Sequence, residues 1–226
     1  YLRLALNMED EQIPPEMMEE ECIKLIESDQ EHPGYWQLLG DFFCAQKRLM
    51  EGLKALRHCY RLSHREWDSV QDKIVEIAGE LSQQMEKDGR NDFEFADICW
   101  TAHRYDKVRE VLGAIEPPEG KELGWLMMMA DSCYELEDYE AAWKYRKEIW
   151  DGCDEEGRVE ALYLDMARDC GLSGRVEEAL ELYCQTGERF GESAELYYLQ
   201  AKLLSDNEQA AEAMEMCEKA LKLEFH

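Results

Sequence analysis

Small and large apolar residues recur along the chain at a spacing that is typical of paired helices. The clearest copy of this template is anchored at Gly40, with a second small residue, Gly52, twelve positions later. Large apolar residues and a cysteine flank the two glycines at Trp36, Leu39, Phe43, Leu56 and Cys59. The template fits again with anchors at Ala96, Ala130, Ala167 and Ala201, and these four are 34, 37 and 34 residues apart.

Each copy of the template predicts two antiparallel helices that pack closely, because a small residue in the middle of each helix lets the backbones approach. Gly174 lies between a helix predicted to end near Leu172 and one predicted to begin near Val176. Asp138 and Asn207 are placed as N-caps of second helices. A single helix pair cannot bury its apolar face alone, so we expect the copies to stack.

This pattern resembles the tetratricopeptide repeat (TPR) family. The resemblance lies in the W..LG..F..G...L..C run from Trp36 to Cys59 and in the alanine pairs at 130/142, 167/179 and 201/213. It implies an all-α fold, a right-handed superhelical solenoid of antiparallel helix pairs, with about five repeats plus an extra long helix. The chain departs from the family at Arg146, where a large apolar residue is expected, and it lacks the usual proline after the second helix.

The extra helix is predicted between the first two anchors, which are 56 residues apart. Apolar residues from Trp67 to Met85 recur there at helical spacing, in a helix that is either inserted or lengthened. We therefore divide one continuous solenoid domain into an incomplete N-terminal repeat with an acidic segment (1–32), a first repeat (33–65), the long helix (66–88) and four further repeats (89–226). Because no polar capping helix is visible at either end, we expect a domain from a longer protein.

The net negative charge of the chain disfavours partners that are themselves negatively charged. The chain has 52 acidic and 25 basic residues, for a net charge of −27. Affinity for nucleic acid or for an anionic membrane depends on lysine and arginine, so we expect neither as a partner. A pentatricopeptide-type RNA reader, which has a similar repeat length, is disfavoured for the same reason.

The cysteines indicate a reducing compartment. Nine cysteines are an odd number, no CxxC pair occurs, and no basic-then-apolar leader precedes the repeats. Cys99, Cys133 and Cys170 share one predicted core position, and Cys59 and Cys217 occupy two others. We therefore expect free thiols and a cytoplasmic protein.

The sequence contains no familiar catalytic or metal-binding motif. The chain has no phosphate-binding glycine loop, no nucleophile elbow, no HExxH pair and no EF-hand loop, and its five histidines lack ligand spacing. We therefore expect no enzymatic activity, no metal and no cofactor.

A basic stripe lies in the second helix of the first repeat. Lys54, Arg57, Arg61 and Arg65 recur at helical spacing on the face opposite Gly52, Leu56 and Cys59. The stripe could bind an acidic partner as a secondary site. The favoured interpretation is that it pairs with the acidic residues between positions 9 and 31.

The resemblance also predicts a concave groove lined by the first helices of successive repeats. The residue three before each anchor gives a mostly apolar column: Gln37, Phe93, Met127, Leu164 and Tyr198. The residue after each anchor gives a column that changes from acidic to basic: Asp41, Asp97, Asp131, Arg168 and Lys202. These columns suit an extended or helical segment, although they could equally pack on neighbouring helices or stay solvated. The family's carboxylate clamp is not expected, because it needs lysine and asparagine where Gln37 and Asp41 stand.

The resulting hypothesis is a protein-interaction module that binds a protein or peptide, as part of a chaperone co-factor or an assembly protein. One alternative is the peptide-sensing domain of a bacterial transcription regulator, which would carry a helix-turn-helix upstream. Another is the non-catalytic helical domain of a multidomain enzyme.

Overall fold

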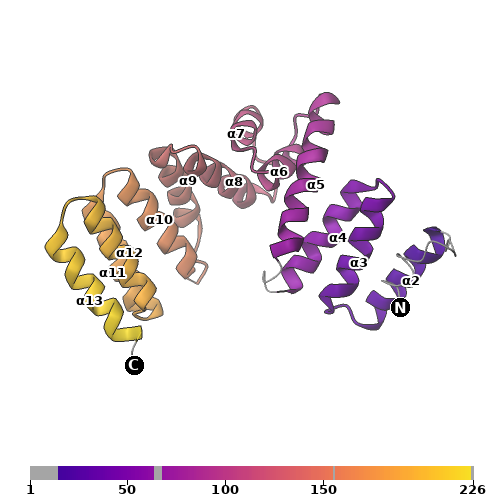
Figure 1. Cartoon of the computed structure of the whole chain (residues 1–226). Coiled ribbons are helices and arrows are strands. Elements are labelled where there is room, and N and C mark those ends of the chain that lie inside the picture. The colour runs from indigo at the N-terminus through magenta and orange to yellow at the C-terminus, as the bar shows by residue number, and fades with distance from the viewer. Residues whose placement is uncertain (1–14, 64–67, 155, 225–226) are drawn as a thin grey trace. The chain divides into compact units, whose positions relative to one another are not determined.

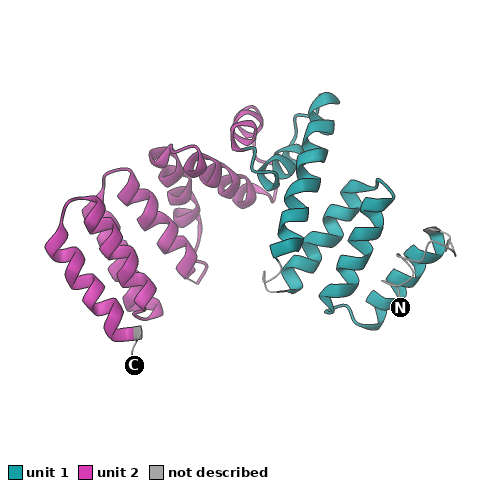
Figure 2. Cartoon of the chain, viewed as in Figure 1, with its two compact units in different colours: residues 1–104 teal, residues 105–226 magenta. Residues whose placement is uncertain are grey.

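The computed structural model describes residues 15–63, 68–154 and 156–224, and all of their regular secondary structure is α-helical (Figure 1). The helices form two compact units, residues 1–104 and 105–226 (Figure 2). The predicted all-α class is confirmed. The grouping of the helices into individual repeats stays a prediction.

The first unit contains α2 (Pro15–Ser28), α3 (Pro33–Ala45), α4 (Leu49–Leu62), α5 (Asp68–Lys87) and α6 (Phe93–Thr101). Consecutive helices of this unit, from α2 to α6, pack against each other. Its core joins Met18, Cys22 and Ile26 of α2 to Leu39, Phe42 and Phe43 of α3 and to Ala55 of α4. The N-terminal segment therefore contributes a helix to the same apolar layer.

The second unit contains α7 (Tyr105–Gly113), α8 (Glu122–Glu135), α9 (Tyr139–Gly152), α10 (Glu160–Leu172), α11 (Val176–Phe190), α12 (Ala194–Asp206) and α13 (Ala210–Glu224). Here too each helix packs on the next. The core around α10 and α11 includes Tyr163, Met166, Cys170 and Tyr183, and it is closed on one side by Leu196 of α12.

The predicted close approach of small residues is present between α3 and α4. A Cβ atom added to Gly40 would lie 2.6 Å from Cγ of Leu56, and one added to Gly52 would lie 2.5 Å from Sγ of Cys44. The backbones therefore meet at these two glycines. The other four anchors, all alanines, are buried as well.

A residue with left-handed backbone follows the first helix of every copy of the template, seven positions after its anchor. These residues are Lys47 (φ 61°), His103 (φ 55°), Glu137 (φ 61°), Gly174 (φ 84°) and Glu208 (φ 62°). In each copy the next N–H donates to a carbonyl five residues earlier, for example Asp138 to Cys133 at 2.8 Å and Gln209 to Leu204 at 2.9 Å. This is the Schellman geometry, which uses carbonyls that the helix end leaves free.

The predicted long helix is α5, which is separate from α4. The helix α4 ends at Leu62, where the N–H of Ser63 donates to Cys59, and α5 begins at Asp68. Its buried residues include Val70, Ile74, Ile77, Leu81 and Met85, as their spacing predicted. Trp67 lies outside the described residues.

One of the two N-cap predictions is wrong. The Asp138 carboxylate accepts a hydrogen bond from the N–H of Ala141 at 3.3 Å and caps α9. Asn207 instead ends α12, where its side-chain amide donates to the carbonyl of Leu203 at 2.8 Å. The left-handed turn at Glu208 moves the start of α13 to Ala210, beyond the reach of Asn207 as a cap.

Candidate functional site

The predicted apolar column is partly exposed in the second unit. Met127 on α8 and Tyr198 on α12 have 49% and 60% of their surface accessible. Leu164, at the same position of α10, is half-buried and packs on the core between α10 and α11. In the first unit, Gln37 and Phe93 are half-buried on α3 and α6. The exposed members of the column therefore lie on first helices of the second unit.

The three acids of the second column all form ion pairs with a neighbouring helix. Nζ of Lys73 lies 2.7 Å from Asp41, and a guanidinium nitrogen of Arg57 lies 2.7 Å from Asp97. Asp131 accepts a hydrogen bond from Arg146 at 3.1 Å. The acids therefore neutralise cations of their own unit, and the column is less acidic than the sequence alone indicates.

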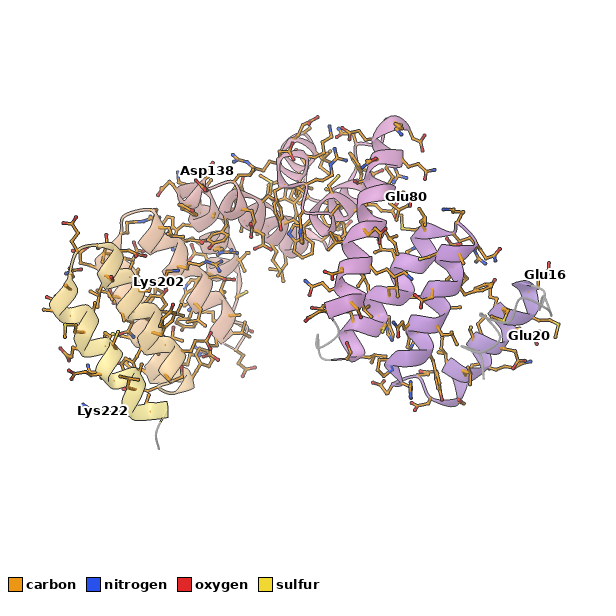
Figure 3. All side chains as sticks on the ribbon, viewed as in Figure 1. Glu16, Glu20, Glu80, Asp138, Lys202 and Lys222 are labelled. Carbon is orange, nitrogen blue, oxygen red and sulfur yellow. The ribbon has the colours of Figure 1, made fainter. Side chains whose placement is uncertain are left out.

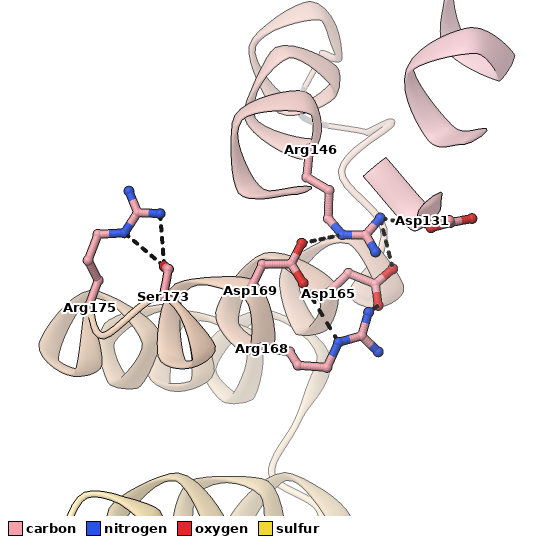
Figure 4. A network of polar contacts seen from close by, with 7 residues as sticks. All are labelled: Asp131, Arg146, Asp165, Arg168, Asp169, Ser173 and Arg175. Carbon is pink, nitrogen blue, oxygen red and sulfur yellow. Dashed lines mark hydrogen bonds and ion pairs between the residues drawn. The ribbon is translucent and has the colours of Figure 1, made fainter. Parts of the chain in front are cut away.

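Arg146 stands where the repeat pattern expects a large apolar residue. In the structure it is a buried cation surrounded by acids (Figure 4). Its Nε atom donates to Asp169 at 2.7 Å, across the contact between α9 and α10. Its Nη1 atom approaches both Asp131 of α8, at 3.1 Å, and Asp165 of α10, at 3.9 Å. One arginine therefore connects three consecutive helices. Removing one partner of a buried ion pair typically costs about 3–5 kcal/mol.

Asp169 is the most deeply buried acid of this cluster, with no accessible surface. Its Oδ2 atom is bonded to Arg146, but Oδ1 accepts no hydrogen bond from the described residues. Burial raises the pKa of Asp169 to about 6, although Arg146 and Arg168 act in the opposite direction. The cluster therefore contains a carboxyl group that can change charge near neutral pH.

Arg168, on α10, is held in one orientation by its neighbours. Its guanidinium lies 2.9 Å from Asp165 and 3.9 Å from the centre of the Tyr134 ring. Its Nε atom lies 3.8 Å from Asp169 (Figure 4). About a third of the side chain remains accessible, at 38%. Lys202, the other cation of this column, is exposed on α12 (Figure 3).

One member of the basic stripe, Arg57, departs from both interpretations of the stripe, and a secondary site at its exposed members stays a prediction. Arg57 points toward α6, where it bonds to Asp97 and to the hydroxyl of Thr101. Its long side chain reaches the neighbouring helix, so it neither faces solvent as a free cation nor pairs with residues 9–31. Lys54 and Arg61 are exposed, with Arg61 bonded to His58 at 2.7 Å, and Arg65 lies outside the described residues. Pairing with the N-terminal segment occurs instead at Arg48, which lies 2.6 Å from Glu19.

An open apolar groove of about 480 Å³ lies between α12 and α13. It was not predicted from the sequence, where Cys217 was assigned to the core. In the structure Cys217 is exposed, because no helix covers the outer side of α13 among the described residues. Six residues line the groove: Ala194, Glu195, Tyr198, Cys217, Ala220 and Leu221.

The described part of the chain offers neither a metal centre nor a membrane span. It holds no group of three or more His, Cys, Asp or Glu side chains arranged for a metal ion. None of its helices combines the length and the hydropathy of a membrane span.

No protein-family model and no curated protein matches the chain. Several solved structures do. A MamA structure aligns with 85% of this chain and 96% of its own at 12% identity and a TM-score of 0.50. YrrB, described as a TPR protein with an unusual peptide-binding site, aligns over 91% and 93% of the two chains at 16% identity and a TM-score of 0.43. A tetratricopeptide repeat protein from Parabacteroides merdae aligns over 91% and 85% at 15% identity and a TM-score of 0.46. Together with the helix pairs and their recurring turns, the MamA likeness identifies the fold as TPR-like.

Proposed function

We propose that the chain is a protein-interaction scaffold that binds an extended or helical segment of a partner on the first helices of its second unit. The observation that carries this proposal is the exposure of Met127 and Tyr198 at the same position of the template, on α8 and α12. Exposed apolar side chains in repeated register offer anchor points that a segment can bury one after another.

The charged column makes the two ends of the proposed site different, so a bound segment would have a preferred orientation. Lys202 is exposed on α12, whereas Arg168 on α10 is already paired with Asp165, so the positive charge at Lys202 favours an acidic group on the bound segment at the α12 end. By template position, Leu164 belongs to the same surface. The equivalent surface positions of the first unit are Gln37, Asp41, Phe93 and Asp97. A role in a chaperone co-factor or an assembly protein is the setting that we favour for such a scaffold.

The test begins with peptides selected from a random display library on the immobilised whole chain. Their affinities are then measured by fluorescence anisotropy for Met127→Ala, for Tyr198→Ala and for a matched control, Leu136→Ala, which removes an exposed leucine outside the column. Truncating an anchor should weaken binding by about 1–3 kcal/mol, and the control should bind as the wild type does.

Charge is tested at Lys202 and not at Asp131, because Asp131 stabilises the buried Arg146. Lys202→Glu should slow association with an acidic peptide, and added salt should reduce the difference. This surface would be excluded as the site if the selected peptides bound Met127→Ala, Tyr198→Ala and Lys202→Glu as tightly as they bind the wild type.

A further inference from the structure

The outer side of the last helix pair is apolar and uncovered in the part of the chain that the structure describes. Leu221 and Met214 of α13 have 53% and 67% of their surface accessible, and Cys217 between them is exposed. Together with Tyr198 of α12, Leu221 and Cys217 line the groove of about 480 Å³. Apolar surface concentrated at a concave site is typical of a binding surface.

The preceding helix pair shows what covers the same positions there. The template places Tyr183, Thr186 and Gly187 of α11 at the positions of Cys217, Ala220 and Leu221. Tyr183 and Thr186 are buried, with 3% and 0% accessible. A Cβ atom added to Gly187 would lie 3.1 Å from Leu196 of α12, so α12 lies directly on this position.

The covering helix uses one face for this contact. Leu196, Leu199 and Leu203 of α12 pack on the core between α10 and α11. They are spaced as i, i+3 and i+7, which places them on one side of a helix. A helix that covered α12 and α13 in the same way would need apolar residues at this spacing.

We propose that the groove between α12 and α13 binds an amphipathic, basic helix of a partner protein, seated as α12 is seated on α10 and α11. This site is separate from the one proposed above, although Tyr198 borders both. The basic character follows from the charges of the helix pair that forms the groove. Glu195 lines the groove, and the segment from Ala194 to Leu223 contains six acidic residues and three lysines. One of these lysines, Lys219, is paired with Glu215 at 3.0 Å.

A second copy of the chain is a poorer occupant than a basic helix. It would bring the same acidic surface to the groove, and each copy carries a net charge of −27. Like charges brought together at an interface oppose binding.

The binding test uses a labelled peptide with the sequence of Ser193–Asn207 that carries Glu195→Lys and Asp206→Lys, titrated with the whole chain to about 1 mM. The unaltered, acidic peptide and a scrambled basic peptide are the matched controls. We expect the basic helical peptide to bind at least about tenfold more tightly than either control, since only it combines the apolar spacing with positive charge.

The site is tested with Leu221→Ser and with Leu172→Ser, a leucine that is 46% exposed and lies outside the groove. Leu221→Ser should weaken binding of the basic peptide about tenfold, and Leu172→Ser should not. Alkylation followed by mass spectrometry gives a second measurement. The bound peptide should protect Cys217 but not Cys184, which is exposed on α11.

Several results would overturn the proposal. These are equal binding of the acidic or scrambled peptide, unchanged binding to Leu221→Ser, or alkylation of Cys217 at its free rate under saturating peptide. If sedimentation shows a dimer that Leu221→Ser converts to a monomer, the occupant is a second copy. Met127→Ala should leave binding of this peptide unchanged, so this site and the proposed function can fail independently.

Discussion

Arg146 and Asp169 form a buried pair of opposite charges where the repeat pattern expects apolar contact. The pair connects α9 to α10, and Asp131 extends the contact to α8. Because one Asp169 oxygen accepts no hydrogen bond from the described residues, the pair only partly compensates the loss of hydration. We infer that the cluster contributes less to the free energy of unfolding than its short distances indicate.

This inference predicts how stability depends on pH. In the unfolded chain Asp169 has its ordinary pKa of 3.8, and in the folded chain burial raises this pKa to about 6. Between these values the folded state keeps a proton that the unfolded state has released, so the contribution of Asp169 is complete below about pH 4 and is lost as the pH rises through 6.

The measurement compares urea unfolding of the wild type with that of Asp169→Asn from pH 4 to 7. The stability of the wild type relative to the variant should fall by about 2–3 kcal/mol over this range. Asp165→Asn, at a more exposed acid of the same cluster, is the matched control. A wild-type advantage that grows with pH would mean that Arg146 stabilises the carboxylate more than burial opposes it.

At the scale of residues, the sequence identified Arg146 as an exception to the repeat pattern but did not identify the acids that pair with it. Arg146 could be recognised as a charge at an apolar template position. Its partners come from two other helices, and nothing in a single sequence distinguishes Asp169 from the many solvated acids of this chain. The same limitation applies to Arg57 and Lys73, whose pairing with column acids depends on the length of their side chains and on the angles between helices.

The element that recurs most regularly is the turn after each first helix. Four of its five left-handed residues are not glycine, although a left-handed conformation costs an L-residue with a Cβ atom roughly 1–2 kcal/mol. The hydrogen bonds of the turn, repeated in all five copies, maintain this conformation. The sequence predicted the turn only at Gly174, because lysine, histidine and glutamate carry no turn signal.

Glycine at these turns should stabilise the protein. We expect Glu137→Gly to raise the free energy of unfolding by about 0.5–1 kcal/mol, because the strain that it removes exceeds the chain entropy that it adds. Glu137→Ala keeps the strain and removes only the charge, so it should give no comparable gain. Chemical unfolding followed by circular dichroism measures both. A destabilised Glu137→Gly would show that the turn has little strain.

The contact between α3 and α4 gives a second prediction at the scale of elements. Gly52→Ala would bring its Cβ atom to 2.5 Å from Sγ of Cys44 and 3.3 Å from the carbonyl oxygen of Gly40. The helices would have to move apart, at a cost of about 1–3 kcal/mol.

Gly79→Ala on α5 is the matched control, since no atom lies within 4 Å of its added Cβ. It should instead stabilise the protein by about 0.5–1 kcal/mol. Equal effects of the two substitutions would show that α3 and α4 do not approach as closely as the structure indicates. The small-residue template itself was visible in the sequence, because it depends on residue volume and spacing alone.

The whole molecule is acidic and rich in cysteine, with nine free thiols. Five of them are buried: Cys22, Cys59, Cys99, Cys133 and Cys170. Burial raises the pKa of Cys170 to about 12 and those of Cys22 and Cys59 to about 11, so these sulfurs stay protonated at neutral pH. Only the thiolate is strongly nucleophilic.

Alkylation of the native protein at neutral pH should therefore modify Cys184 and Cys217 first, and all nine cysteines should react after unfolding without a reductant. Mass spectrometry of the digested protein gives the order of modification. Rapid native alkylation of Cys170 would contradict its burial, and disulfide-linked peptides would contradict the free thiols. The sequence placed Cys217 in the core because a template treats every repeat alike, whereas the last described helix has an uncovered side.

The order in which helices pack has a consequence for folding speed. Within each unit, the substantial contacts join helices that follow one another along the chain. Proteins with such local contacts fold quickly, because little chain entropy is lost before the first favourable contact forms. A helix pair closed by its own Schellman turn can therefore act as a nucleus wherever it lies, and structure can spread from it to its neighbours. In the reverse direction, the α12–α13 pair can open while α8–α11 stay folded, so its amide hydrogens should exchange faster than those of α10.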